Sequence, residues 1–171
     1  MLNGSNGGPS EWLAQGQVVS AWSRAGKGLP FAAFMVSAED MDRIAKGQLT
    51  STRHMADMKK IDPAVLERAR IPVERITGPV LLISGSDDQP GPSDESARMV
   101  IERLARYKHP YEYKHVDYAG AGHLVFLPQM ITGNRRFMNG GHAKADAHGG
   151  VAAWAETLDF LRRHFDASLP R

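Results

Sequence analysis

An uninterrupted apolar run, Pro79-Val80-Leu81-Leu82-Ile83-Ser84, lies between Gly78 and Gly85 and decides the fold class. The run does not alternate between apolar and polar residues, which is typical of a strand that is buried on both faces. Such strands occur in parallel sheets that helices cover on both sides. The sequence therefore predicts an α/β fold with a mostly parallel sheet flanked by helices.

The residues that follow continue this pattern. Ser93 is expected to cap a helix with Asp94 and Glu95 in its first turn, where their charge favours the helix dipole. A stripe at helical spacing extends this helix: Ala97, Val100, Ile101, Leu104 and Ala105. Residues 111–116 predict a second strand, and a loop is expected over residues 118–126.

The C-terminal end predicts another amphipathic helix. After a Gly- and His-containing excursion over residues 128–150, apolar residues recur at helical spacing from Val151 to Phe165. We expect three of them, Trp154, Leu158 and Leu161, to pack in the core. The order strand, helix, strand, loop, helix is typical of an α/β domain.

The residues before this core predict less regular structure. We expect a loop over residues 1–31, of which residues 1–20 are flexible, and a helix starting near Ser37. Asp62 and Pro63 suit the cap and the first position of another helix. Sheets usually have about four to six strands, and only two are evident here. We therefore predict that residues 1–171 form a single domain that is part of a larger α/β fold.

Composition excludes several functional classes. The 171 residues are 42% hydrophobic and 23% charged, with a formal net charge of +2, so the sequence lacks the basic footprint of a nucleic-acid-binding protein. Cysteine is absent, which excludes a disulfide scaffold, a thiolate zinc site and a cysteine nucleophile in this chain. We find no apolar run of about 20 residues that would span a membrane and no signal peptide, and we expect a cytoplasmic protein.

Two loops carry the residues with catalytic chemistry. Asp87 and Asp88 follow the first predicted strand, and His123 follows the second within Ala119-Gly120-Ala121-Gly122-His123. The carboxyl ends of parallel strands gather ligand and catalytic groups. An acid and a later histidine are the second and third members of a hydrolase triad, in which the carboxylate orients the imidazole and stabilises its protonated form.

These two loops and their surroundings resemble one family. The segments Ile71–Asp88, Pro92-Ser93 and Ala119–His123 are similar to the C-terminal catalytic domain of acyl-CoA thioesterases and bile acid-CoA:amino acid N-acyltransferases. Further segments that resemble this domain are Ser20–Phe31, Gly140-Gly141 and Trp154. The resemblance implies the C-terminal part of an α/β-hydrolase fold, close to the dienelactone hydrolases.

The resemblance also implies an activity and its residues. Asp88 matches the acid of the family and His123 its base, and the expected reaction is hydrolysis of an acyl-CoA thioester through an acyl-enzyme. Acyl-CoA is then the substrate, and no metal or redox cofactor is implied. We also considered a metal site at His142, Asp146 and His148, but their spacing matches no strong motif.

One part of the family pattern is missing from the sequence. The family places its nucleophile in a Gly-x-Ser/Cys-x-Gly elbow, and Asn3-Gly4-Ser5-Asn6-Gly7 is the nearest imitation. We therefore expect this chain alone to be inactive, with partners that include a separate N-terminal half or a second copy. Three alternatives stay open: an inactive remnant or partner-binding fragment, an acyl-CoA:amino acid N-acyltransferase, and a small hydrolase with an unrecognised serine nucleophile.

Overall fold

The computed structural model describes residues 13–14, 17–18, 20, 23–32, 37–48, 51, 61–126, 128 and 139–165. The chain divides into two compact units, residues 1–72 and residues 73–171. The second unit contains the predicted strand that decides the fold class and both sequence segments with Asp88 and His123.

The first unit contains two short hairpins where a loop was expected. β1 (Leu13–Ala14) pairs with β2 (Gln17–Val18), and β3 (Ser23–Arg24) pairs with β4 (Lys27–Gly28), each antiparallel. The turn between β3 and β4 has Ala25 at φ 50° and Gly26 at φ 76°. Two central residues with positive φ match the tight hairpin turn whose twist fits the strands. Alanine is an uncommon residue there, so the sequence carries little turn signal.

Both helices of the first unit begin where the sequence predicts. α1 (Ala38–Ala45) follows Ser37, whose hydroxyl accepts a hydrogen bond from the Asp40 amide. α2 (Pro63–Ala69) follows Asp62, whose carboxylate accepts from the amides at the second and third helical positions. These side chains satisfy donors that have no partner inside a helix.

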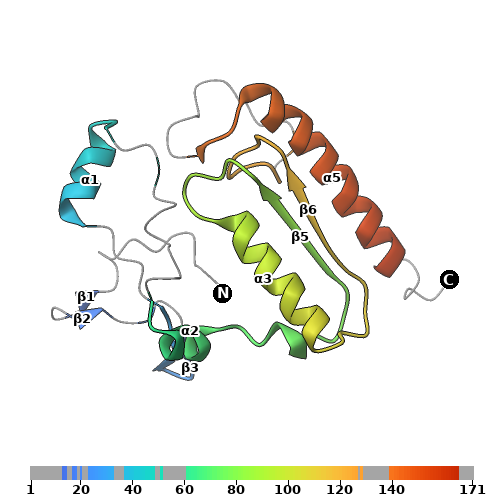
Figure 1. Cartoon of the computed structure of the whole chain (residues 1–171), viewed down its shortest axis with the longest axis horizontal. Coiled ribbons are helices and arrows are strands. Elements are labelled where there is room, and N and C mark those ends of the chain that lie inside the picture. The colour runs from blue at the N-terminus through green and yellow to red at the C-terminus, as the bar shows by residue number, and fades with distance from the viewer. Residues whose placement is uncertain are drawn as a thin grey trace. The chain divides into compact units, whose positions relative to one another are not determined.

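The second unit is built on a parallel pair of strands, which confirms the α/β prediction. It runs η4 (Val73–Arg75), β5 (Val80–Gly85), α3 (Ser93–Arg106), β6 (Tyr113–Tyr118) and α5 (Ala143–Phe165). The register runs from Val80 opposite Tyr113 to Gly85 opposite Tyr118. Figure 1 shows α3 and α5 on opposite sides of the two strands. The carboxyl ends of both strands therefore lie side by side.

The helix after β5 begins as predicted but with a different cap. Pro92 is the N-cap of α3, and Ser93 is its first residue. The Ser93 hydroxyl is buried without a hydrogen-bond partner in the described structure, so the predicted Ser93 cap is wrong. Leu104 of this helix is fully buried. Arg103 pairs with Glu74 of η4 and lowers the pKa of that carboxyl to about 2.

α5 begins at Ala143, eight residues before the start that periodicity predicts. The predicted excursion over residues 128–150 is therefore helical in its last part. Gly149 lies inside the helix, and a Cβ there would overlap the Val125 side chain and contact Tyr118. The glycine lets the helix approach the sheet closely, and it also weakens the helical pattern in the sequence.

The apolar stripe of α5 points away from the core. The buried face consists of small residues and one ring, Gly149, Gly150, Ala153 and Phe160. Trp154 is 45% exposed and Leu161 is 41% exposed, so their predicted core packing is wrong, whereas Leu158 is partly buried. The helix packs through its small residues because the sheet lies too close for larger ones.

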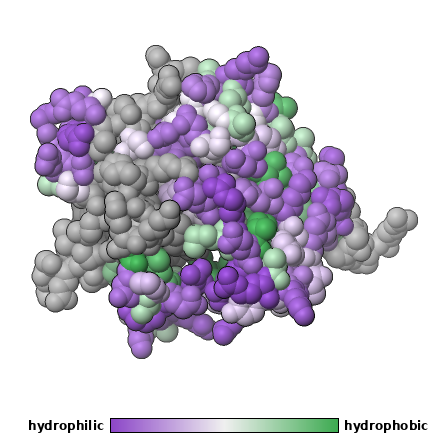
Figure 2. Space-filling model, in the orientation of Figure 1, coloured by the Kyte–Doolittle hydropathy of each residue, from purple (hydrophilic) through white to green (hydrophobic). Residues whose placement is uncertain are grey.

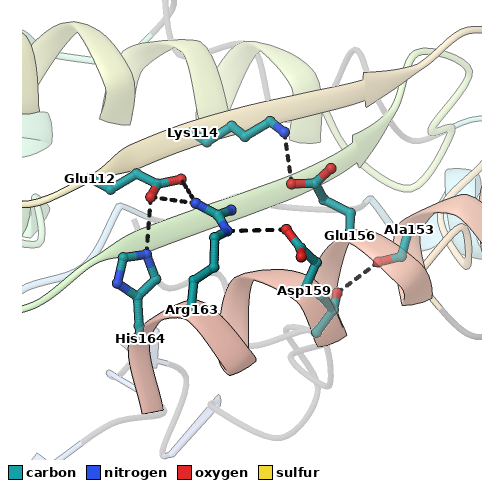
Figure 3. A network of polar contacts seen from close by, with 8 residues as sticks. Glu112, Lys114, Ala153, Glu156, Asp159, Arg163 and His164 are labelled. Carbon is teal, nitrogen blue, oxygen red and sulfur yellow. Dashed lines mark hydrogen bonds and ion pairs between the residues drawn. The ribbon is translucent and has the colours of Figure 1, made fainter. Parts of the chain in front are cut away.

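Ion pairs attach α5 to β6 and the residue before it (Figure 3). Glu112 accepts hydrogen bonds from Arg163 and His164 near the end of α5, and Lys114 of β6 pairs with Glu156 at 2.7 Å. The Arg163 guanidinium lowers the pKa of the Glu112 carboxyl. Exposed pairs of this kind contribute little free energy each, and they join the end of α5 to β6 at its polar edge.

The visible surface is mainly hydrophilic. Figure 2 shows apolar residues as separate small patches between polar ones on this face. Among the described residues, no helix is long and apolar enough to cross a membrane.

We predict that the two faces of α5 respond differently to truncation. Phe160→Ala removes a ring that is 7% exposed and should lower the free energy of unfolding by about 3–5 kcal/mol. Trp154→Ala removes a side chain that is 45% exposed and should cost about 1 kcal/mol or less. Urea denaturation of both variants measures the difference, and equal losses would contradict the observed orientation of the helix.

Candidate functional site

Asp88 lies in the turn that follows β5 and is almost completely buried. Its residue exposure is 2%, and its backbone bridges to Gly140. Its amide donates to the Gly85 carbonyl, and its Oδ1 accepts from the Gly91 amide at 3.3 Å. A buried carboxylate has to be held by hydrogen bonds to be stable, and these contacts fix the Asp88 side chain.

His123 lies in the loop after β6 and faces Asp88. Its Nδ1 is 3.1 Å from both carboxylate oxygens of Asp88. An ionised carboxylate only accepts hydrogen bonds, so Nδ1 carries the proton and donates it. In the neutral ring this leaves the Nε2 lone pair available. The His123 side chain is 36% exposed, against 3% for Asp88, so the imidazole is open to solvent on one side.

The electrostatics of the pair favour the protonated imidazole. The hydrogen bond from Nδ1 to Asp88 and the charge of that carboxylate raise the pKa of His123 above 6.5, while burial lowers it and only partly offsets the rise. This is the effect expected of a carboxylate that stabilises an imidazolium. The structure thus brings together the two residues that the sequence predicted.

Asp87 has a different environment from its neighbour. Its Oδ2 accepts a hydrogen bond of 2.8 Å from the Gly141 amide, and its own amide donates to the Ala121 carbonyl. Its Oδ1 accepts from Gln89. Asp87 therefore fastens the loop after β5 to the two segments beside it, and Asp88 is the carboxylate that faces the imidazole.

The residues just before α5 connect the two loops. The His123 amide donates to the Asn139 carbonyl at 2.8 Å, and the His142 amide donates to the Gly120 carbonyl at 3.0 Å. A Cβ at Gly140, whose φ is +66°, would overlap the Asp87 carbonyl. Only glycine fits this position. In the sequence, only the family resemblance drew attention to Gly140 and Gly141. Because residues 128–150 were expected to form an irregular excursion, nothing in the sequence placed these glycines beside the site.

Other polar residues suggested by the sequence lie elsewhere or have other contacts. Asp146, one of the three residues considered as metal ligands, accepts a hydrogen bond from the Gly122 amide. In the described part of the chain, no group of three histidine or acidic residues has the geometry of a metal site. The nearest elbow-like segment, residues 3–7, lies outside the described residues.

A serine that sequence reasoning missed lies within β5. Ser84 is 2% exposed, and its hydroxyl hydrogen-bonds to His115 and Asp117 of β6. The three side chains form a serine, histidine and acid cluster on one face of the strands. The burial of Ser84 closes it to an ester substrate, so this cluster joins the two strands.

Comparison with known proteins identifies the family. A family model described as BAAT / Acyl-CoA thioester hydrolase C terminal matches residues 12–167. The chain belongs to this family. Two mouse (Mus musculus) proteins are similar: the peroxisomal succinyl-coenzyme A thioesterase, 28% identical over 110 residues, and acyl-coenzyme A thioesterase 6, 28% identical over 108 residues.

The relatives are much longer than the matching segment. The matches cover 59% and 58% of this chain but 26% of each relative, so the chain matches about a quarter of their length. The predicted resemblance to a thioesterase-family C-terminal domain is confirmed. One relative has "peroxisomal" in its name, and a cytoplasmic location for this chain stays a prediction.

We predict that Asp88 sets the ionisation of His123. In Asp88→Asn the neutral amide no longer stabilises the imidazolium, while burial still opposes it, so the His123 pKa should fall from above 6.5 to 6.5 or below. An NMR titration of the imidazole signals measures both values. Equal pKa values in the two proteins would contradict the observed pair.

The raised pKa of His123 also determines how the stability of the protein depends on pH. Because the folded-state pKa of His123 is raised above its ordinary value of 6.5, the stabilisation from the pair is fully present below pH 6.5. It is lost as the pH rises through the raised pKa. Asp88→Asn should remove this part of the pH dependence of unfolding.

Proposed function

We propose that the chain supplies the acid and the base of an α/β-hydrolase that hydrolyses acyl-CoA thioesters, with Asp88 as acid and His123 as base. The observation that carries the proposal is the 3.1 Å contact of Nδ1 with a buried carboxylate, at the carboxyl ends of two parallel strands. Membership in the thioester hydrolase family supports the substrate class. The names of both mouse relatives support it too.

The geometry fits the two proton transfers that thioester cleavage needs. With Nδ1 bonded to Asp88, neutral His123 takes the proton of an attacking nucleophile at Nε2. The nucleophile bonds to the acyl carbon, and the imidazolium gives its proton to the CoA thiolate when the carbon–sulfur bond breaks. Water then attacks the acyl-enzyme with His123 again as base, and a free acid is released.

The raised pKa of His123 has a defined consequence for this mechanism. The imidazole has to be neutral to accept a proton, so activity should increase with pH through the raised pKa of the residue. The acidic limb of the pH–rate profile is therefore expected above pH 6.5, the ordinary value for histidine.

The decisive test is CoA release by the protein purified from its own cells with a tag at its C-terminus. The purified protein then has its natural length, whatever residues the cells make before the tag. His123→Ala should lower the rate of CoA thiol release from fatty acyl-CoA by about 10²–10⁴. Asp159→Ala, which removes an exposed carboxylate on α5, should leave it unchanged.

Two results would contradict the proposal. One is thiol release that is equally fast in wild type and His123→Ala. The other is a folded wild-type protein that releases no thiol even when it is purified together with the partners that supply the nucleophile. The family description also covers amino acid N-acyltransferases, so glycine is added to a parallel reaction. A free acid as product supports the hydrolase, and an N-acyl amino acid supports the transferase.

A further inference from the structure

The first turn of α5 contains a carboxylate that the triad chemistry does not use. Asp146 Oδ1 accepts a hydrogen bond of 2.7 Å from the amide of Gly122, the residue directly before His123. Gly122 is buried, and a buried amide that loses its acceptor costs free energy. Asp146 therefore holds the backbone that carries the imidazole.

The approach of Asp146 depends on the glycine turn before the helix. A Cβ at Gly141, whose φ is +80°, would overlap the Asp146 carboxylate and approach the Gly122 amide. The Gly141 amide itself donates to Asp87, next to Asp88. Gly141 thus lies between two carboxylates. Asp87 accepts from the Gly141 amide, and Asp146 accepts from the Gly122 amide.

The helix stabilises a negative charge at this place. α5 has 23 residues, and Asp146 lies in its first turn, where the amides and the helix dipole favour an anion. The Asp146 amide donates to the His142 carbonyl, so its backbone is already helical. The start of the helix therefore sets where the carboxylate lies.

We propose that Asp146 is a positioning residue for His123. Through the Gly122 amide it keeps the imidazole in line with the Asp88 carboxylate, and it does not touch the substrate. The proposal rests on the proposed function, in which the pair is the base and the acid. Because Asp146 acts through the hydrogen bond of Nδ1, its loss should appear in the ionisation of His123.

Three variants separate the hydrogen bond from the charge. Asp146→Ala removes both, whereas Asp146→Asn removes the charge but keeps an oxygen that accepts from the Gly122 amide. Asp159→Ala removes a carboxylate from the same helix, where its side chain is 64% exposed and pairs with Arg163. The Ala and Asn variants at position 146 differ only in the acceptor and its side-chain volume.

NMR titration of His123 in the full chain is the readout. We expect Asp146→Ala to lower the His123 pKa by about half a unit or more relative to Asp146→Asn. The downfield signal of the Nδ1 proton should weaken in the Ala variant and persist in the Asn variant. Asp159→Ala should match the wild type in both respects.

Equal His123 pKa values in the Ala and Asn variants would overturn the proposal. If Asp146→Ala does not fold, hydrogen exchange of the Gly122 amide in wild type and Asp146→Asn decides. Protection in both supports the hydrogen bond, and exchange at the rate of an exposed amide overturns it. Neither readout requires turnover, so a failure of the proposed thioesterase activity is distinguishable from a failure of this proposal.

Discussion

The parallel pairing of β5 with β6 determines where the chemistry of this chain lies. Gly85 and Tyr118 are partners at the end of the register, so the turn that carries Asp88 and the loop that carries His123 start side by side. Parallel strands need a long connection, and α3 supplies it on one side of the sheet. Every contact of the candidate site depends on this shared edge.

Glycines and aspartates then hold the two loops at bonding distance. A Cβ at Gly85 would overlap the Ala121 carbonyl, so the first loop approaches the second only where a side chain is absent. Asp87 and Asp146 accept hydrogen bonds from the amides of Gly141 and Gly122. Buried amides are satisfied by these carboxylates, and Asp88 remains directed at the imidazole.

Much of this arrangement was predictable because local signals were strong. The uninterrupted apolar run predicted the parallel strand, although residues 80–83 are only partly buried in the structure. The helices that follow Ser37 and Asp62 begin where the sequence predicts. Position after a strand predicted that Asp88 and His123 would meet, although Asp87 and Asp88 are neighbours with the same chemistry. What separates them is the direction of each side chain, which is set by contacts with residues 54 and 35 positions away.

The rest depended on tertiary contacts that leave little trace in the sequence. The glycines of α5 hid its first two turns, because glycine weakens a helical pattern wherever it occurs. Periodicity also identified an amphipathic helix but assigned Trp154 to the wrong side. The face of small residues around Ala153 is buried because the sheet lies close to it. That short distance arises only when the helix packs on the sheet, so the sequence of the helix does not reveal it.

The central claim is that Asp88 fixes one tautomer of His123. Its most direct test is the ring-nitrogen NMR spectrum of neutral His123, recorded above its pKa. We expect a proton on Nδ1 and a bare Nε2, because the carboxylate accepts only at Nδ1. A neutral ring protonated on Nε2 would contradict the account, since Nδ1 would then have no proton to donate to Asp88.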